Sequence, residues 1–383
     1  MSKRIIFLEA VQNFGGARKS TIELATRLKN NGIDVLIVDF WGSCDPFVEE
    51  VGRRNLPIEF LDKRNEPIIL SEGKLTKRAA NIVKYFAKSI VYRRRFAEIC
   101  EKFNPDYVVV NNLKTLSILR RGTGYKIFFF ARGWFLPQTI SPKGRLLLKK
   151  MVDCFIGVSQ STRQAIYAGG FAKLEDIYVI PNAMDNIPVS KRSWDVLEGK
   201  ESFQIMHCGG FLPTKGQEIA LKIAKHLKNK DVRFKMKLVG VIYQGVNSQK
   251  YYERIRTLIK EWELEEYVNI VLNKPNVIDL FQEIDVLIHP SDTEGLPRVV
   301  MEAMAHGKPV IGNPVGGMLD YINHNFTGYI ANHNSVYDYI EYLTELYNNK
   351  DKYKFISDNC RNLIMNSYSS TSQFESAKNV FRR

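Results

Sequence analysis

The chain has 383 residues, of which 45% are hydrophobic and 25% are charged. This composition is typical of a soluble globular protein with room for two cores, and it excludes intrinsic disorder as the main state. No apolar run approaches the roughly 20 residues that a membrane-spanning helix needs. A strand-like run starts at Ile5, so we expect no signal peptide before it.

The formal net charge of +14 lies mostly in the first half of the chain. Residues 1–190 hold 30 Lys and Arg against 18 Asp and Glu, whereas residues 191–383 hold 25 against 23. An anionic partner of the first half is expected, such as a membrane surface or a phosphorylated acceptor. No RNA- or DNA-binding motif accompanies the basic residues, so nucleic acid is not an expected partner. The five cysteines form no Cys-x-x-Cys pair, which favours a reducing cytoplasm over a disulfide framework or a zinc site.

Short apolar runs alternate with helical stretches in two series along the chain. The predicted strands of the first series are Ile5–Glu9, Val35–Asp39, Tyr107–Val110, Ile127–Phe130, Phe155–Val158 and Tyr178–Ile180. Those of the second series are Ile205–Cys208, Met236–Val239, Val268–Leu272, Val286–His289 and Pro309–Ile311. The predicted helices include Arg18–Asn30, Ser161–Ala168, Gln217–Lys228, Tyr251–Trp262 and Arg298–His306. This alternation predicts two doubly wound α/β domains with parallel sheets. The polar stretch Asn186–Lys200 is the expected boundary between the two domains, although an ordinary surface loop would have the same composition.

Two glycine-rich turns lie between a predicted strand and the helix that follows it. The first contains Gly15 and Gly16, which would let a ligand approach the backbone and the helix N-terminus. It lacks the full Gly-x-Gly-x-x-Gly spacing, and a merely tight turn explains it equally well. The second runs from Gly209 to Gly216 and brings Lys215 to a helix entry, where an ammonium can meet a diphosphate. Its spacing does not match a P-loop, and a solvated lysine is the alternative.

The most specific segment is residues 292–305, which follow the predicted strand Val286–His289. Glu294 lies in the loop before a helix and Glu302 lies within that helix, so the two carboxylates can grip two parts of one polar ligand. Pro297 suits the first helical turn, and Gly295 frees backbone N–H groups to face an anion or a sugar hydroxyl. Helix capping by Glu294 alone is the alternative. Another glycine-rich loop, 312–320, follows, and all four segments lie at strand carboxyl ends, where open α/β sheets bind ligands.

With these segments in place, the chain resembles retaining glycosyltransferases of the GT-B fold, in glycosyltransferase family 4. The matching features occur in the family's order: Gly15-Gly16, residues 180–185, the Gly209 to Gly216 loop, Glu294-x7-Glu302 and Gly316-Gly317. The resemblance implies an α/β protein with two doubly wound Rossmann-like domains facing a central cleft. It implies an acceptor domain at 1–190, a donor domain at 191–365 and a C-terminal helix, 366–383, that returns to the first domain.

The resemblance also implies the reaction and the roles of individual residues. The enzyme would move a hexose or N-acetylhexosamine from a nucleotide sugar, UDP rather than GDP by family frequency, with retention of configuration. The acceptor would be a lipid-linked saccharide in the assembly of a surface polysaccharide such as lipopolysaccharide or capsule. Glu294, Lys215 and Arg132 would be catalytic. The donor would be held by Gly15, Gly16, Gly209, Gly210, Lys215, Val277, Glu294, Gly295, Leu296, Pro297, Arg298, Val299 and Glu302, with Glu302 on the ribose and Glu294 on the transferred sugar.

Three positions depart from the family pattern. Gly210 stands where the family usually has an arginine, so a cation for the leaving diphosphate is missing; Arg298 or Arg18 are candidates to replace it. Arg132 stands where a histidine is common, and Asp320 stands where glutamate is frequent. No Asp-x-Asp motif occurs, so we expect no catalytic metal and no cofactor beyond the nucleotide sugar, with charge stabilised by Lys215 and helix N-termini. A front-face attack then fits better than a covalent intermediate on Glu294.

Two other functions remain open on the same fold. One is a nucleotide-sugar epimerase or hydrolase, which would need an acid/base set in the first domain, where no histidine occurs. The other is a non-catalytic subunit that binds nucleotide sugars, which the departures at Gly210 and Arg132 favour.

Residues 74–102 combine nine basic side chains with apolar residues at near-helical spacing. The basic residues are Lys74, Lys77, Arg78, Lys84, Lys88, Arg93, Arg94, Arg95 and Lys102, and the apolar ones are Ile82, Val83, Phe86, Ile90, Val91, Phe96 and Ile99. One interpretation is an amphipathic helix that packs on the first sheet and exposes a solvated basic face. The other is that the basic face lies on anionic lipid, at the inner face of the cytoplasmic membrane. The apolar face can pack inward in either case.

Overall fold

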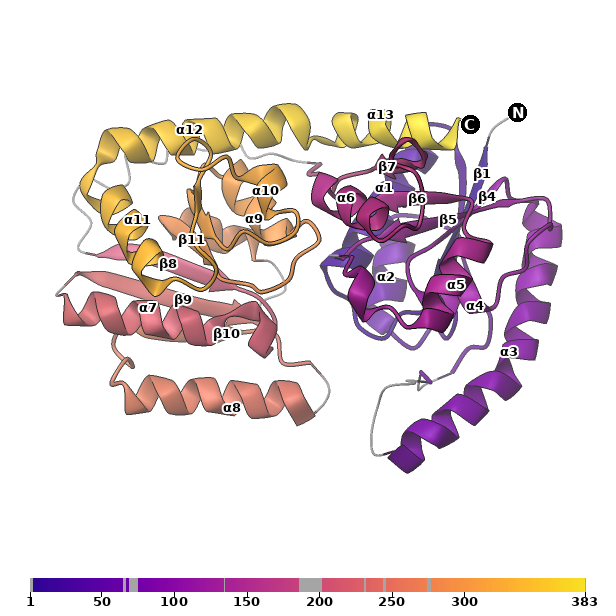
Figure 1. The fold of residues 1–383 in the computed structure, drawn as a ribbon, viewed down its shortest axis with the longest axis horizontal. Helices are drawn as coiled ribbons and strands as arrows, with labels where there is room; N and C mark the ends of the chain where they lie inside the picture. Colours follow the sequence, from indigo (N-terminus) through magenta and orange to yellow (C-terminus); the bar gives the residue numbers. More distant parts are fainter. Residues whose placement is uncertain are drawn as a thin grey trace. The chain divides into compact units, whose positions relative to one another are not determined.

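The computed structural model describes residues 3–64, 67–68, 75–133, 135–185, 202–230, 232–243, 246–273 and 277–382. The chain forms two compact units (Figure 1). Unit 1 comprises Met1–Asn182 with Gln373–Arg383, and unit 2 comprises Ala183–Ser372. The boundary expected within residues 186–200 lies outside the described residues. Among the described residues, no helix is both long enough and apolar enough to cross a membrane.

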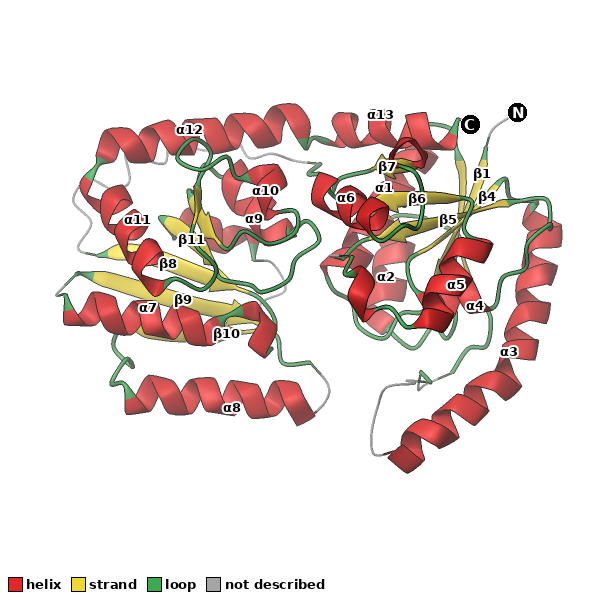
Figure 2. Ribbon diagram, in the orientation of Figure 1, coloured by secondary structure: helices red, strands yellow, loops and turns green. Residues whose placement is uncertain are grey.

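Unit 1 is built on a seven-stranded sheet in the order β3-β2-β1-β4-β5-β6-β7, with every neighbouring pair parallel. Its strands are β1 (Arg4–Glu9), β2 (Asp34–Asp39), β3 (Ile58–Phe60), β4 (Tyr107–Val110), β5 (Lys126–Ala131), β6 (Cys154–Gly157) and β7 (Ile177–Val179). Its helices are α1 (Gly16–Asn30), α2 (Asp45–Arg53), α3 (Leu75–Phe103), α4 (Leu113–Ser117), α5 (Pro142–Met151) and α6 (Gln160–Ala168). Figure 2 shows these helices around the strands.

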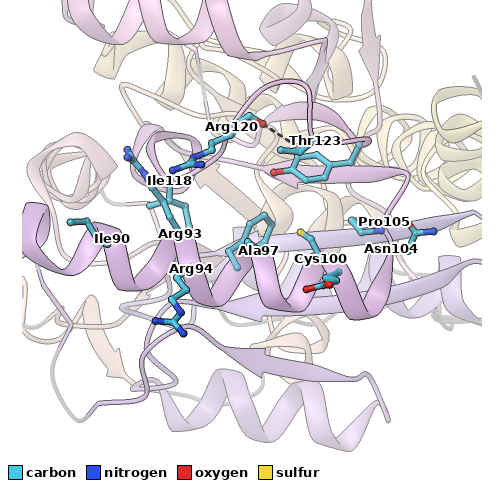
Figure 3. Close-up of a pocket in the computed structure, with 13 residues that line it drawn as sticks. Ile90, Arg93, Arg94, Ala97, Cys100, Asn104, Pro105, Ile118, Arg120 and Thr123 are labelled. Atoms are coloured by element: carbon cyan, nitrogen blue, oxygen red, sulfur yellow. Dashed lines mark hydrogen bonds between the residues drawn. The ribbon is translucent and has the colours of Figure 1, made fainter.

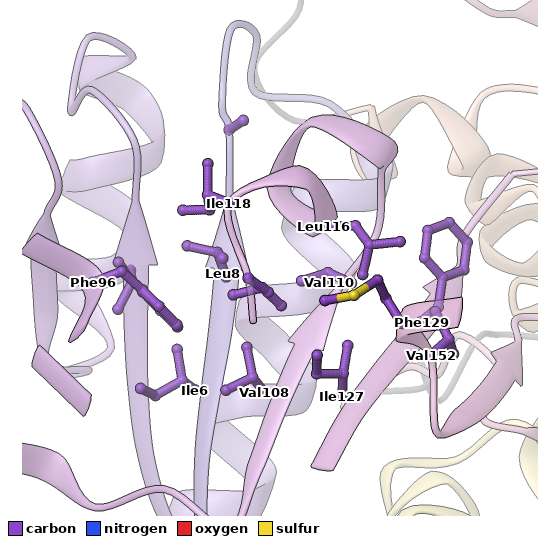
Figure 4. Packing of buried hydrophobic residues seen from close by; sticks show 14 of the residues in the cluster. Ile6, Leu8, Phe96, Val108, Val110, Leu116, Ile118, Ile127, Phe129 and Val152 are labelled. Carbon is purple, nitrogen blue, oxygen red and sulfur yellow. The ribbon is translucent and has the colours of Figure 1, made fainter. Parts of the chain in front are cut away.

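The core of unit 1 forms because the central strands are apolar on both faces, as strands between two helical layers must be. Figure 4 shows one side of this core, where side chains of β1, β4 and β5 meet those of α3 and α4. The residues include Ile6, Leu8, Val108, Val110, Ile127, Phe96 and Leu116, all at most 3% exposed. The last helix, α13 (Ser370–Phe381), packs on the same unit through Phe381, whose ring stacks on Phe128 with centroids 5.8 Å apart.

Unit 2 is built on a six-stranded parallel sheet in the order β10-β9-β8-β11-β12-β13. Its strands are β8 (Phe203–Cys208), β9 (Phe234–Gly240), β10 (Val268–Leu272), β11 (Val286–His289), β12 (Val310–Gly312) and β13 (Tyr329–Ile330). Its helices are α7 (Gln217–Asn229), α8 (Val246–Glu261), α9 (Arg298–Ala305), α10 (Met318–Tyr321), α11 (Val336–Asn348) and α12 (Lys350–Ser367).

Both sheets reverse their winding direction at one point. In unit 1 the reversal lies between β1 and β4, and in unit 2 it lies between β8 and β11. At such a point the loops after the two strands diverge to opposite faces and leave a crevice at the carboxyl edge, which is where doubly wound sheets bind ligands. The predicted fold class, two doubly wound Rossmann-like α/β domains, is therefore confirmed.

The predicted elements agree with the structure to within a few residues, with two strands missed. Those two, β3 and β13, have only three and two residues and carry no usable periodicity.

The expectation for the basic segment is partly wrong. Residues 75–103 form one continuous helix, α3. Phe96 and Ile99 are buried as expected, and Tyr85 and Tyr92 are buried with them. The other five apolar residues do not pack inward: Val83, Phe86 and Ile90 are 70%, 68% and 71% exposed, and Ile82 and Val91 are 44% and 45% exposed. Lys74 and the side chains of Lys77 and Arg78 lie outside the described part of the helix.

Candidate active site

The candidate site in unit 2 lies where β8 and β11 end side by side. The loop after β8 carries Gly209 to Gly216, and the loop after β11 carries residues 290–297. The two loops pack tightly on each other: Asp292 N donates to Thr214 O at 2.9 Å. Gly216 has φ +76°, and a Cβ there would lie 2.0 Å from Pro290 O. Glycine at 216 is therefore required both by the backbone conformation and by the close approach of the second loop.

A charged cluster joins the two loops. Lys215 Nζ donates to Glu294 Oε1 at 2.7 Å, and His289 Nε2 lies 2.9 Å from the same oxygen. Burial opposes ionisation of Glu294, but the hydrogen bond and charge of His289, with the charge of Lys215, outweigh it and lower the pKa of Glu294 to about 2. Glu294 is thus a carboxylate at neutral pH, with one oxygen held and the side chain still partly exposed.

His207, on β8, fixes the backbone of the lysine loop. Its Nε2 lies 2.7 Å from Lys215 O, and the ring is fully buried. Burial lowers the pKa of His207 to about 4, so the ring is neutral at pH 7 and Nε2 carries the proton that it donates to the carbonyl. His207 and His289 sit on adjacent strands, because His207 pairs in register with Ile288.

Glu302 and Arg298 lie together on the first turns of α9. Arg298 Nη2 is 3.3 Å from Glu302 Oε1, and both side chains are 11% exposed. Arg298 is thus engaged with the carboxylate that was expected to bind ribose. Pro297 is the N-cap residue of α9, and no side chain caps the helix. The N–H groups of its first turn can therefore serve an anion.

Gly295 and Leu296 are held by the loop after β12. Gly317 N donates to Gly295 O at 2.8 Å, and a Cβ on Gly317 would lie 2.2 Å from that oxygen. The Gly316-Gly317 pair, which the sequence analysis noted, thus packs against the loop that carries Glu294. Val299, on the first turn of α9, is half-buried; Val277, also half-buried, precedes the short helical turn Ile278–Gln282.

Tyr243 occupies the space in which the family's arginine would start. A Cβ on Gly210 would lie 2.3 Å from Tyr243 Cε2. Gly209 has more room, because its nearest neighbour, Lys215 Cβ, would be 3.5 Å away. Gly210 therefore lies directly against the Tyr243 ring, a contact that the sequence pattern did not reveal.

The remaining predicted site residues belong to unit 1. Gly15 is the N-cap residue of α1, with no side-chain cap and open space where a Cβ would stand, and Gly16 is the first helical residue. Arg18 Nε is 3.3 Å from the buried carboxylate of Glu9, so it too is engaged. Arg132 follows β5, and its guanidinium lies over the Phe130 ring, 4.0 Å from the centroid. These residues share the carboxyl edge of the first sheet, whereas Lys215 and Glu294 belong to unit 2.

The same edge carries a polar cavity of about 410 Å³ that the sequence analysis missed. It is lined by Ala10, Gln12, Asn13, Arg18, Asn112 and Lys114. Beneath it, Asn111 Nδ2 donates to both oxygens of Glu9, at 2.7 and 2.8 Å. Burial lowers the pKa of Lys114 to about 8, and its ammonium lies over the Trp41 ring. The only sequence signal was the position of these residues after β1 and β4, at the winding reversal.

His207, His289 and Tyr243 were also missed. The first two are the last but one and the last residue of strands that end in the site, so strand position could have found them. Nothing local pointed to Tyr243. In the described part of the chain, no group of three or more His, Cys, Asp or Glu side chains is arranged to hold a metal ion.

The comparisons with known proteins concern the family and the fold of the chain. Residues 190–363 match the family described as Glycosyl transferases group 1, and residues 14–186 match Glycosyltransferase Family 4. An uncharacterized glycosyltransferase of Haemophilus influenzae is 23% identical over 373 residues, which are 94% of this chain and 95% of that protein. The amylovoran biosynthesis glycosyltransferase AmsK of Erwinia amylovora is 29% identical over 139 residues, 34% of this chain and 32% of that protein.

Among solved structures, Anabaena HepE in complex with UDP-glucose is similar, with a TM-score of 0.80 and 19% identity, over 99% of this chain and 100% of that chain. The fold and the matched families define a GT-B glycosyltransferase that uses a nucleotide sugar. The chain belongs to glycosyltransferase family 4, a retaining family.

Proposed function

We propose that this enzyme transfers a hexose or N-acetylhexosamine from a UDP-sugar to a lipid-linked saccharide during assembly of a surface polysaccharide. The observation that carries the proposal is the contact of Lys215 with Glu294 at the winding reversal of unit 2. A cation and a carboxylate held together there can serve the diphosphate and the sugar of one donor.

In this proposal unit 2 binds the donor with each group in a separate role. Glu302 accepts hydrogen bonds from the ribose hydroxyls. Lys215 donates one of its three ammonium N–H groups to Glu294. The other two donate to the diphosphate, together with the backbone N–H groups at the N-terminus of α9. Glu294, ionised at neutral pH, accepts a hydrogen bond from the transferred sugar.

The chemistry follows from these roles. As the bond from the sugar to the diphosphate breaks, negative charge grows on the diphosphate, and Lys215 and the α9 N-terminus stabilise it. The leaving phosphate accepts the proton of the attacking hydroxyl on the same face, so configuration is retained. Because Lys215 and His289 hold one oxygen of Glu294, this carboxylate is better suited to orient the sugar than to attack it.

Arg298 and Arg18 are weaker candidates to replace the missing arginine than the sequence suggested. Each contacts a carboxylate of its own unit, Arg298 with Glu302 and Arg18 with Glu9. We assign the diphosphate to Lys215 first, and we assign Arg298 to the orientation of Glu302.

The acceptor is assigned to unit 1, through the polar cavity at the end of β1 and β4 and through Arg132 after β5. The half-buried Lys114 in that cavity suits a phosphorylated or polyhydroxylated molecule. UDP and a polysaccharide product are supported by similar proteins: HepE was solved with UDP-glucose, and AmsK is named for amylovoran biosynthesis.

Peripheral attachment to an anionic membrane, through the basic unit 1, completes the proposal. The exposed apolar side chains of α3 support attachment more directly than its charges do, because Arg94, Arg95 and Lys88 each contact a carboxylate of their own unit. An enzyme attached in this way would work at the surface where lipid-linked saccharides reside.

Product analysis tests the proposal. The enzyme is incubated with UDP- and GDP-sugars and a polyprenyl-diphosphate sugar, with and without EDTA. We expect transfer from one UDP-sugar, with the anomeric configuration of the donor kept and with EDTA having no effect. Release of free or epimerised sugar would support a hydrolase or epimerase, and donor binding without turnover would support a non-catalytic subunit. Loss of activity in EDTA, restored by Mn²⁺ or Mg²⁺, would contradict metal independence.

A further inference from the structure

A second cavity of unit 1, of about 700 Å³, lies between α3 and the loops that lead into β4 and β5 (Figure 3). This volume falls in the range of roughly 300–1,000 Å³ that small-molecule sites occupy. Its apolar lining includes Ile90, Phe96, Ala97, Cys100, Ile118 and Tyr125. Burial raises the pKa of the Cys100 thiol to about 12, so the thiol is neutral and adds to the apolar lining.

This cavity is separate from the site described above. Asn104 and Pro105 precede β4, and Thr123 and Tyr125 precede β5, so the cavity lies at the amino ends of these strands. The polar cavity with Lys114 lies at the carboxyl ends of β1 and β4. Since all strands of the sheet are parallel, the two cavities occupy opposite edges of it.

The exposed apolar stripe of α3 leads directly into the cavity. Ile82, Phe86 and Ile90 are spaced four residues apart and therefore lie on one face of the helix. The same face continues through Arg93, Ala97 and Cys100, which line the cavity. Ile90 belongs to both surfaces and is 71% exposed. The exposed apolar side chains of α3 thus lie next to a partly open cavity, with Ile90 shared by both and Arg93 at its edge.

The charges at the cavity favour an anion. Arg93, Arg94 and Arg120 line it, against one acidic residue, Glu101. Figure 3 shows the three arginines toward the end where Ile90 lies, with Cys100, Asn104 and Pro105 toward the other end. Arg93 Nη2 donates a hydrogen bond to Ser117 O at 3.0 Å, and Arg94 Nε lies 3.4 Å from Glu98 Oε1.

We propose that this cavity takes the acyl chain of an anionic phospholipid, with the lipid phosphate at Arg93 and Arg120. The exposed stripe from Ile82 to Ile90 lies in the lipid interface while one chain enters between α3 and the sheet. An apolar chain suits the lining, and a phosphate suits guanidinium groups at the mouth. The inference rests on the membrane attachment proposed above and adds a defined lipid site to it.

Binding of a single-chain lipid tests the site without a membrane. The probe is lauroyl-lysophosphatidylglycerol below its critical micelle concentration, measured by native mass spectrometry and calorimetry, with glycerophosphoglycerol as the headgroup alone. We expect one lipid per chain and at least tenfold weaker binding of the headgroup. Ala97→Trp fills the cavity and should weaken lipid binding at least tenfold. Ala87→Trp is the matched control, because Ala87 is also exposed on α3 but does not line the cavity.

Arg120→Ala is a second variant that leaves the helix intact and should reduce the preference for the anionic lipid over lauroyl-lysophosphatidylcholine. Equal lipid binding by wild type and Ala97→Trp, binding of the headgroup as tight as that of the lipid, or no binding by wild type would overturn the proposal. Sugar transfer to a water-soluble acceptor is measured in parallel. Lipid binding without transfer would overturn the proposed function alone, and transfer without lipid binding would overturn the lipid site alone.

Discussion

Lys215 Nζ lies 2.7 Å from Glu294 Oε1, although the two residues are 79 positions apart in the chain. They meet because β8 and β11 are neighbouring parallel strands whose carboxyl ends share one edge. The pair is held from both sides: His207 bonds the Lys215 carbonyl, and His289 contacts the Glu294 carboxylate. Two charges positioned in this way before a ligand arrives need little reorganisation during the reaction.

Removing either member of this pair should lower turnover. We expect Lys215→Ala to lower kcat by on the order of 10²–10³-fold and to weaken UDP-sugar binding, because the charge that it meets grows in the transition state. Glu294→Gln should lower kcat while the Kd of UDP stays within about threefold. Steady-state kinetics and calorimetry measure both. Lys237→Ala, which breaks the Lys237–Glu283 pair outside the site, is the control. A kcat of Lys215→Ala equal to that of the control would remove this lysine from the mechanism.

The buried His207 should make stability depend on pH. Its pKa in the folded protein is about 4, against an ordinary value of 6.5. Below pH 6.5 His207 binds a proton in the unfolded chain but stays neutral in the folded chain. The free energy of unfolding therefore falls as pH drops from 6.5 toward 4. The loss is on the order of 1 kcal/mol per pH unit. Urea unfolding of wild type and His207→Gln at pH 7.0 and 5.0 should show the smaller loss in the variant. An equal loss in both proteins would mean that another group carries the effect.

Gly210 and Tyr243 should behave as a coupled pair. We expect Gly210→Arg alone to lower the melting temperature, because the new Cβ would lie 2.3 Å from Tyr243 Cε2. Tyr243→Ala should make room, so the double variant should be more stable than Gly210→Arg and should bind UDP more tightly than Tyr243→Ala. A double-mutant cycle in melting temperature and UDP affinity measures the coupling. Additive effects would show that Tyr243 does not compete for this space.

The sequence predicted the fold and most of the donor loops because both depend on strong local signals. Continuous apolar runs located every strand except β3 and β13, and glycine, proline and acidic residues marked the loops after β8 and β11. Glu294 and Lys215 were expected to act on one ligand, and the structure brings them into contact.

What the sequence did not reveal depends on contacts between distant segments. Tyr243 fills the space beside Gly210 from another loop, and no pattern near either residue records that. The apolar residues of α3 were expected to face inward, since an apolar stripe usually marks the buried side of a helix. This helix carries two stripes: Tyr85 and Tyr92 enter the core with the expected Phe96 and Ile99, and the other five apolar residues of the expected set are exposed.

The exposed stripe of α3 should contribute to membrane attachment. We expect the protein to co-sediment with phosphatidylglycerol vesicles, less so in high salt, because the screened charges act together with inserted apolar side chains. Phe86→Ser should reduce sedimentation several-fold. Phe355→Ser is the control, because Phe355 is also exposed, at 45%, but lies on α12. Arg93, Arg94 and Arg95 changed together to glutamate should also reduce it. Equal sedimentation with neutral and anionic vesicles, or none with either, would reject attachment by charge.

The most direct test of the donor site is the affinity of UDP for Glu302→Ala. The Glu302 side chain is 11% exposed, contacts Arg298 and lies one helix turn from the N-terminus of α9, which no side chain caps. If it holds the ribose, calorimetry should show a loss of about 1.5–3 kcal/mol, a Kd raised roughly 10- to 150-fold. Glu341→Ala, an exposed glutamate on α11, should bind UDP like wild type. A Kd for Glu302→Ala equal to that of wild type would contradict the assignment of the donor to the loops after β8 and β11.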